Sequence, residues 1–446
     1  MGMRDKSLIV LTHVCQAWRE LFISRTSLWT HLDLNSMSEN KIRAYLERSK
    51  FSPISLSLYR DNPMLPTDPF FQIFPNAVGR LKSLSIDVET EHLQDITVHL
   101  TPPTPLLEHL SISGGRRRLS LHPVLTSGLF NGDLSSLRSL RLDTVRTELP
   151  WRNMVNLTSF ALRRTPAGEI SVAQLLDFFG SAPHLREVYL CSVTLSSGAQ
   201  GGRLVSLTCL KKIQIDDCGL PSVLLDHLLI PVGAELTIKA DVLGTLIGDI
   251  LPRALDNLRN FSNPTTIKLS AWGMDPFMMF SGPNGGVYIY FKHCQVDKIC
   301  LMLESFTQLD TSETKRLRIQ NGNPSSRGPL HQALLPMRGL RALSLYECYS
   351  PHIFVRALDP STSSSEVVVC PKLEELILVL RDGHTDVLYL KGLTRMAEAR
   401  ALKGKKLKTV RIIHKRNKSD PEDVLELRKH VGHVEYDPRV CAFDDW

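Results

Sequence analysis

A short apolar template recurs along this chain: apolar, two variable residues, apolar, one variable residue, apolar. Within two blocks of copies, the interval varies from 20 residues (Leu137 to Leu157) to 34 residues (Leu373 to Leu407). The nine clear copies begin at Leu81, Leu107, Leu137, Leu157, Leu185, Leu210, Leu340, Leu373 and Leu407. An interval of this size corresponds to one supersecondary unit, so the template predicts an array of similar units.

Each copy of the template predicts a strand, and helices are expected between the strands. The last three template positions have the period of two that places both apolar side chains on one face of a strand. Segments with helical spacing of apolar residues follow Ser171, a potential N-cap, and Pro221, and a third spans residues 243–251. We therefore expect an α/β fold.

A single strand-helix unit of this length cannot bury its own apolar face, whereas stacked units share one continuous core. The chain contains 70 Leu among 446 residues, and a continuous core of this kind needs many such apolar side chains. An ordinary α/β domain whose strands match the template by chance is the alternative. The number of copies favours a solenoid.

The template resembles that of leucine-rich repeat proteins, in an irregular form. The Asn or Cys that these repeats carry just after the strand is mostly absent, although Cys191 and Cys218 lie near that place. Asp87, Ser113 and Asp143 follow the strand in other copies. The resemblance implies a leucine-rich-repeat-like solenoid over residues 51–446, with irregular stacking of its units.

The first 50 residues contain an apolar stripe at helical spacing. It is formed along a predicted helix over residues 7–23 by Leu8, Leu11, Val14, Cys15, Trp18, Leu21 and Phe22. The segment 11–21 and the following segment 27–34, with Leu28 and Trp29, resemble the second half of the F-box-like domain of many fungal proteins. This resemblance implies a short helical F-box remnant over residues 1–50, ahead of the repeats.

In that family the F-box docks onto the Skp-type adaptor of a cullin ubiquitin ligase. The family's opening Leu-Pro segment and first helix are missing here, so we expect either a truncated F-box or a member that has lost this arm. Leu8, Leu11 and Val14 are the candidate adaptor contacts. The resemblance assigns Cys15, Trp18, Leu28 and Trp29 to the structural motif, with both Trp expected to pack between the helix and the first repeat.

The sequence contains no recognisable catalytic motif. Phosphate-binding loops, dinucleotide fingerprints, zinc-protease motifs and nucleophile elbows are all absent from the sequence. The nine Cys include no C-x-x-C pair, which is typical of reduced thiols in the cytoplasm or nucleus and does not favour a metal site. No apolar run is long enough for a membrane span. We therefore expect neither an enzyme nor a cofactor, and no membrane partner.

Two basic segments are candidates for contact with an acidic partner, in a chain of net charge +7. The first is Arg116, Arg117 and Arg118, in a predicted loop after a repeat strand. The second, over residues 403–418, includes Lys405, Lys406, Lys408, Lys415 and Arg416. A solvated edge strand, neutralised locally by Asp420, Glu422, Asp423 and Glu426, is the alternative for the second segment. Aromatic residues are not interleaved there, so nucleic acid is not favoured.

The region 273–329 departs from the template. It contains Met274, Met278 and Met279 together with Phe277 and Phe280, followed by a strand-like segment over residues 287–291. Met and Phe together are typical of an adaptable core patch. If these side chains were exposed on the concave face, they would form a recognition surface.

These patterns favour a protein-interaction scaffold over an enzyme. The first hypothesis is the substrate-recognition subunit of an SCF-type (Skp-cullin-F-box) ubiquitin ligase, in which the N-terminal segment holds the adaptor and the repeats hold an unknown protein target. The second is a repeat-only protein-binding module that has lost adaptor binding.

Overall fold

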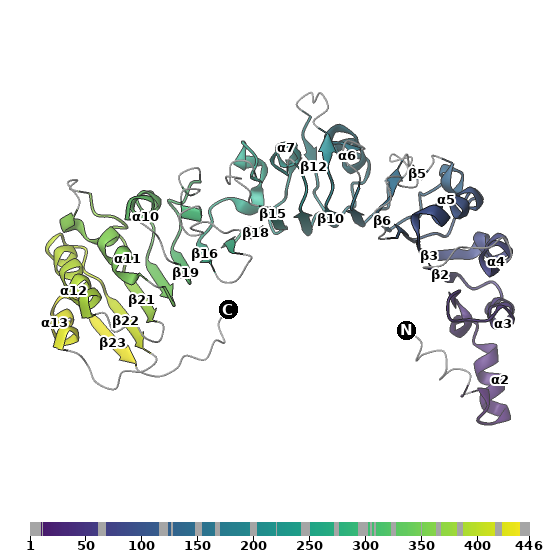
Figure 1. Ribbon diagram of the computed structural model, residues 1–446, viewed down its shortest axis with the longest axis horizontal. Helices are drawn as coiled ribbons and strands as arrows, with labels where there is room; N and C mark the ends of the chain where they lie inside the picture. Colours follow the sequence, from purple (N-terminus) through teal and green to yellow (C-terminus); the bar gives the residue numbers. More distant parts are fainter. Residues whose placement is uncertain are drawn as a thin grey trace. The chain divides into compact units, whose positions relative to one another are not determined.

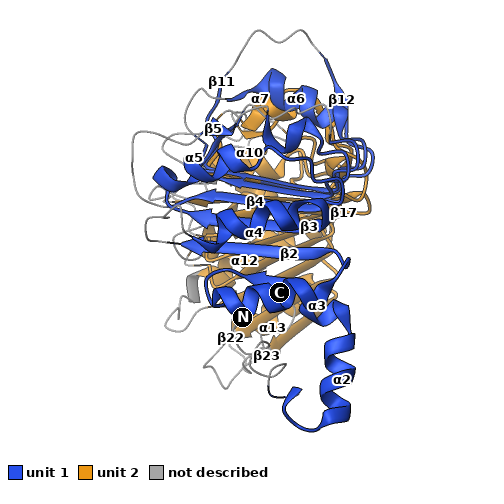
Figure 2. Ribbon diagram, turned by 90° about the vertical axis from the view of Figure 1, so that its right-hand side faces the viewer, with its two compact units in different colours: residues 1–214 blue, residues 215–446 orange. Residues whose placement is uncertain are grey.

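The computed structural model divides the chain into two compact units, residues 1–214 and 215–446 (Figure 2). The structure describes residues 10, 12–60, 68–115, 124–125, 128–147, 154–165, 170–196, 203–219, 221–241, 250–271, 276–292, 302–303, 306, 309–322, 327–348, 350–362, 367–380, 387–414 and 422–437. Each unit is a mixed α/β structure, and its main sheet is largely parallel.

The N-terminal segment of unit 1 differs from the predicted helix over residues 7–23. Helix α2 (Gln16–Ser24) begins only after Cys15, whose backbone is extended with φ −156° and ψ 170°. Arg19 stabilises this break, because its side-chain Nε donates a hydrogen bond of 2.9 Å to the carbonyl oxygen of Thr12. The prediction of one continuous helix is therefore wrong.

The sheet of unit 1 is built by the template strands in chain order. After β1 (His31–Asp33) come β2 (Ile54–Arg60), β3 (Leu81–Val88), β4 (His109–Gly114), β6 (Ser139–Asp143), β8 (Ser159–Arg163) and β10 (Glu187–Cys191). Each strand pairs in parallel with the next, and the register aligns Leu84, Leu110, Leu140, Phe160 and Val188. β13 (Lys212–Asp216), the strand of the sixth copy, spans the boundary between the units. The strands predicted from the template are confirmed.

Short helices connect the strands of unit 1. These are η1 (Thr26–Trp29), α3 (Glu39–Ser49), α4 (Pro69–Ala77), η2 (Val78–Arg80), α5 (Thr90–His99), η3 (Leu129–Gly132) and α6 (Val172–Ser181), and α3 to α5 lie along one side of β2 and β3 (Figure 1). The short strands β5 (Val124–Leu125), β7 (Arg146–Thr147), β9 (Ile170–Ser171), β11 (Leu195–Ser196) and β12 (Val205–Ser206) complete the unit. The predicted cap is confirmed, because Ser171 and Gln174 form a capping box at α6.

Unit 2 contains a parallel block at its C-terminal side. Here β19 (Arg316–Gln320), β20 (Ala342–Tyr346), β21 (Glu375–Leu380), β22 (Thr409–His414) and β23 (His433–Asp437) pair in parallel in chain order. Helices α10 (Arg327–Leu334), α11 (Pro351–Leu358), α12 (Val387–Leu402) and α13 (Glu422–His430), with η8 (Pro360–Thr362), lie between these strands in sequence and beside them in space (Figure 1). β22, which follows the basic residues 403–408, is paired on both sides, so the expectation of an edge strand is wrong.

An antiparallel meander interrupts the parallel order at the start of unit 2. β16 (Thr266–Ser270), β17 (Phe277–Gly282) and β18 (Gly285–Lys292) pair antiparallel, and β15 (Glu235–Asp241) pairs with β18 while β16 pairs with β19. The predicted strand over residues 287–291 is confirmed within β18. The shorter elements nearby are α7 (Pro221–Leu225), β14 (Leu228–Leu229), η5 (Leu255–Asn257) and η6 (Arg259–Phe261), and the helix predicted over 243–251 lies almost wholly outside the described residues.

A left-handed residue follows six of the parallel strands at the same place. The residues are Thr144, Arg164, Ser192, Asp217, Asn321 and Glu347, with φ between 50° and 58°. This conformation costs a non-glycine residue about 1–2 kcal/mol, but the backbone N–H of Thr144 donates to Arg163 on the next strand at 3.0 Å. Asn321 donates in the same way to Tyr346 at 2.8 Å. These hydrogen bonds therefore offset the backbone strain. The same sharp turn follows each of these strands.

Candidate functional site

Apolar side chains are exposed around helix α2. None of the residues of α2, all of which are described, is buried. The exposed fractions are 62% for Val10, 57% for Val14, 45% for Trp18 and 50% for Leu21. Figures 1 and 2 show α2 projecting away from the strands of unit 1. We call these four residues the N-terminal apolar surface.

The two predicted motif tryptophans have different surroundings. Trp29 is fully buried, its Nε1 donates a hydrogen bond of 2.9 Å to the Phe22 carbonyl oxygen, and its ring meets Tyr45 edge-on at 4.9 Å. The expected packing of Trp29 is confirmed. The expected burial of Trp18 is wrong, because its side chain is 45% exposed, with its ring 5.9 Å from that of Phe22 on the same helix.

The other F-box candidates lie in various environments. Cys15 is an exposed free thiol, and Leu28 is half-buried. Among the candidate adaptor contacts, Val14 is exposed, whereas Leu8 and Leu11 lie outside the described residues. The sequence did not single out Val10, although it completes the exposed stripe.

The predicted basic segments do not form one continuous patch among the described residues. Arg116, Arg117, Arg118, Lys415 and Arg416 lie outside them, while Lys405 and Lys406 are exposed. Lys408 Nζ lies 2.9 Å from Glu374, the residue before β21, and Arg411 Nε lies 2.7 Å from Glu435 of β23. The neutralising carboxylates found here thus lie on, or directly before, the neighbouring strands, whereas Glu426 pairs with Lys429 of its own helix.

A column of polar side chains runs across the start of the strands in unit 1. It consists of the first variable residue of each template copy: Lys82, Glu108, Arg138, Thr158, Arg186 and Lys211. Each backbone N–H donates a 2.8 Å hydrogen bond to the carbonyl oxygen of the preceding member. We call this row the leading column. Neighbouring members lie about 4.8 Å apart, the spacing of paired strands.

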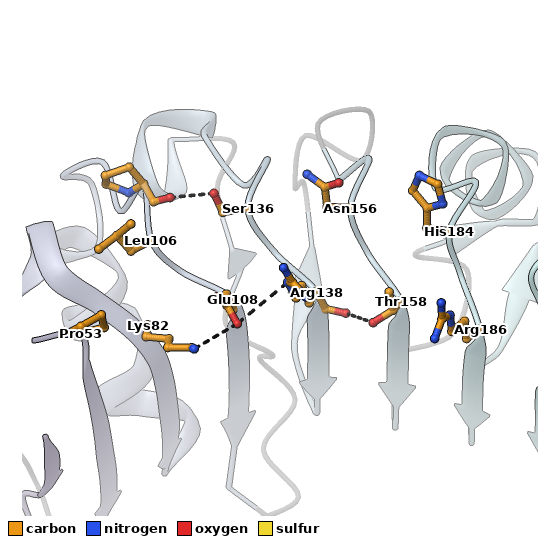
Figure 3. Close-up of a pocket in the computed structure, with 11 residues that line it drawn as sticks. Pro53, Lys82, Leu106, Glu108, Ser136, Arg138, Asn156, Thr158, His184 and Arg186 are labelled. Carbon is orange, nitrogen blue, oxygen red and sulfur yellow. Dashed lines mark hydrogen bonds and ion pairs between the residues drawn. The ribbon is translucent and has the colours of Figure 1, made fainter. Parts of the chain in front are cut away.

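A groove of about 460 Å³ follows the leading column from β3 to β10 (Figure 3). Residues of the preceding turns, including Ser136, Asn156 and His184, line its other side. Ser136 Oγ donates to the Pro105 carbonyl oxygen at 2.7 Å, and Thr158 Oγ1 donates to the Arg138 carbonyl oxygen at 2.9 Å. These hydroxyl protons are therefore already used, and the charged residues supply the remaining donors.

Only one half of the groove contains a carboxylate. Glu108 Oε2 lies 3.5 Å from Lys82 Nζ and 3.9 Å from Arg138 Nε (Figure 3). No ion pair to Arg186 is found among the described residues. The groove was not predicted from the sequence, because the first variable position of the template has no constraint within its own copy.

The meander in unit 2 has a second group of interacting side chains. Met278 and Phe280 are buried, as expected for a core patch, whereas Phe277 is half-buried with its ring 5.7 Å from Tyr290. Lys292 Nζ lies 2.7 Å from Asp216 and 2.6 Å from Asp217. Burial lowers the pKa of Lys292, but these two carboxylates outweigh burial and raise it. Lys239 Nζ also lies 4.0 Å from Asp216, so the two lysines balance the two aspartates of this cluster.

Buried thiols are held in their protonated form. Burial raises the pKa of Cys348 and of Cys370 to about 12 in each case, so neither is a nucleophile at neutral pH.

Among the residues that the structure describes, no group of three or more His, Cys, Asp or Glu could hold a metal ion. In the same part of the chain, no helix has the length and apolar character needed to cross a membrane.

No protein-family model matches this chain, and the search of curated proteins gives no match.

Proposed function

We propose that this protein is a protein-interaction scaffold that serves as a substrate-recognition subunit of an SCF-type ubiquitin ligase. The observation that carries the proposal is the N-terminal apolar surface, because Val14, Trp18 and Leu21 are exposed and no residue of α2 is buried. In this proposal the surface binds the Skp-type adaptor, and the strand units bind the target in the cytoplasm or nucleus.

The chemistry of this surface suits a protein partner. Fully burying one Leu or Val side chain contributes about 1.5–3 kcal/mol, and Trp is enriched among the residues that dominate binding energy. Gln16 and Glu20, four residues apart, share one side of α2, where Gln16 Nε2 donates a hydrogen bond of 3.0 Å to Glu20 Oε1. A partner helix could therefore cover the apolar residues and leave this polar pair in water.

The target-binding part is proposed to be an irregular leucine-rich-repeat-like solenoid. Three features support this: parallel strands in chain order, helices between them, and a left-handed residue at the same place after successive strands. Solenoids of this kind bind partners on surfaces that extend over several units. The leading column is one such surface.

A repeat-only binding module that has lost adaptor binding is the second candidate. The resemblance to the F-box covers only the second half of that domain, and α2 has only nine residues. On this alternative, the strand units would bind a partner without presenting it to a ligase.

Co-purification with the Skp-type adaptor tests the proposal. We expect the full chain to retain the adaptor, and a Trp18→Ala, Leu21→Ala double variant to lose it. Phe51→Ala is the matched control, because Phe51 is 95% exposed but lies outside α2. Circular dichroism of each variant would verify that it remains folded.

A second arm separates the two candidates. A complete F-box is grafted ahead of Leu8, and co-purification is repeated. Adaptor recovery with the graft alone would favour a truncated F-box over a module that has lost adaptor binding. No recovery in either case would contradict the ligase proposal.

A further inference from the structure

One charge pattern occurs both in the leading column of unit 1 and at the equivalent positions of unit 2. We call three such residues on neighbouring strand starts a rung. In unit 1, Glu108 lies between Lys82 and Arg138, 3.5 and 3.9 Å from their nitrogens. In unit 2, Glu374 lies between Arg341 and Lys408, and the three are joined by backbone hydrogen bonds of 2.9 and 2.8 Å. In both rungs a carboxylate at the start of one strand lies between cations at the starts of the two neighbouring strands.

The electrostatic coupling in the second case is direct. Lys408 Nζ lies 2.9 Å from Glu374 Oε1. The hydrogen bond from Lys408 lowers the pKa of Glu374, and the charges of Lys408 and Arg341 act in the same direction. One carboxylate at this position is therefore stabilised by cations on both sides.

The rung formed by Arg138, Thr158 and Arg186, which shares Arg138 with the first, breaks this pattern. Arg138 and Arg186 flank Thr158, whose backbone N–H donates to Arg138 and whose carbonyl oxygen accepts from Arg186, both at 2.8 Å. The rung therefore has the geometry of the other two, but a hydroxyl group replaces the carboxylate. Lys211, on the following strand, adds a further cation.

The nearest alternative partner does not fill this position. Glu187 follows Arg186 directly in the sequence and is exposed, yet no ion pair between them is found among the described residues. Two guanidinium groups consequently face the groove beside Thr158 with no carboxylate between them (Figure 3).

We propose that the groove binds an acidic peptide segment, and that one carboxylate of the ligand lies over Thr158 between Arg138 and Arg186, where the other rungs have a Glu. The inference rests on the proposed function and deepens it, since it names the chemical class of the target segment. Arginine suits this role because its guanidinium donates two parallel hydrogen bonds to a carboxylate.

The lining of the groove favours a peptide over a nucleic acid. None of its lining residues is Phe, Tyr or Trp, so no such ring is available for base stacking. Leu106, which is 45% exposed, and Pro53 provide apolar contact at one end. An acidic peptide can place a carboxylate between the two arginines and an apolar side chain against Leu106 and Pro53.

The test measures binding of a fluorescein-labelled hexaglutamate peptide to the full chain by fluorescence anisotropy at low ionic strength, with hexaglutamine as the uncharged control. We expect Arg138→Ala and Arg186→Ala to weaken hexaglutamate binding by about threefold to tenfold each. Arg43→Ala is the matched control, because Arg43 is an exposed arginine that pairs with Glu39 of its own helix. It should leave binding unchanged.

Three results would overturn the proposal. The first is equal binding of hexaglutamate and hexaglutamine. The second is hexaglutamate binding that neither groove variant weakens, which would assign it to another basic segment such as residues 403–418. The third is tighter binding of a single-stranded oligonucleotide through the same two arginines.

Failure of this test is distinguishable from failure of the proposed function. The anisotropy measurement uses the chain without the adaptor, so loss of adaptor binding leaves its result unaffected. Conversely, adaptor co-purification depends on Trp18 and Leu21, which lie outside the groove.

Discussion

The rungs centred on Glu108 and on Thr158 share Arg138 and have the same backbone hydrogen bonds, but only the first contains a carboxylate. Because parallel strands of a repeat place equivalent residues side by side, one rung serves as an internal reference for the other. The difference teaches that a missing carboxylate can be recognised by comparing two rungs of the same chain, with no homologous sequence needed. At the Thr158 position, Arg186 has no carboxylate partner among the described residues, and Arg138 has one only on its other side, at Glu108.

The largest effect is expected for Thr158→Glu, which completes the open rung. The new carboxylate would pair with Arg138 and Arg186 and compete with the ligand for both, so we expect hexaglutamate affinity to fall by about tenfold or more. Fluorescence anisotropy measures the change. Thr158→Val, which removes the hydroxyl without adding charge, should bind hexaglutamate as the parent chain does. Unchanged affinity in Thr158→Glu would contradict the comparison between the rungs.

Opening the complete rung is the converse change. Glu108→Thr would leave Lys82 and Arg138 without their carboxylate, and we expect a second peptide site and hexaglutamate affinity about twofold to fivefold higher. Isothermal titration calorimetry with a peptide that carries a single Glu gives the stoichiometry. Glu91→Thr removes an exposed carboxylate from α5 instead and serves as the control. A stoichiometry that stays at one peptide per chain would argue against equivalent rungs.

Much of the fold was predictable from the sequence because each copy of the template encodes its own strand. The alternation of Leu140 and Leu142 determines which face of β6 is buried, and both residues are at most 1% exposed. The cap at Ser171 was also predictable, since it depends on a residue only three positions away. Local chemistry suffices for both features.

Features that depend on neighbouring elements were not predictable. The F-box resemblance assigned the same packing to Trp18 and Trp29, but of the two only Trp29 is buried, with Tyr45 of α3 against its ring. The same limitation applies to the leading column: Arg138 and Arg186 are 48 residues apart in the sequence, and only the strand register joins them through Thr158. The leading column could have been found by aligning the template copies and comparing the residues at the first variable position.

A smaller effect is expected on stability. Glu108→Gln removes an ion pair whose carboxylate side chain is 29% exposed, so we expect the free energy of unfolding to fall by less than about 1 kcal/mol. Thr158→Glu should raise it by a similar amount, because it creates the equivalent pair. Urea denaturation of the variants measures both changes. Two changes of the same sign would show that the rungs are not electrostatically equivalent.

The smallest effect is a pH dependence at the complete rung of unit 2. Lys408 and Arg341 lower the pKa of Glu374 in the folded chain, below the ordinary value of about 4.3 expected for the unfolded chain. A carboxylate with a lowered pKa stabilises the fold above its unfolded pKa, and this stabilisation is lost as the pH falls through the folded value.

The thermal midpoint of the parent chain should therefore exceed that of Glu374→Gln at pH 7, and the difference should shrink to zero as the pH falls below about 4. Because the Glu374 side chain is 40% exposed, added salt should also reduce the difference. In a Lys408→Ala background, Glu374→Gln should have a smaller effect at pH 7. An undiminished effect there would mean that Glu374 acts through contacts other than the rung, and the carboxylate position could then no longer serve as the reference for Thr158.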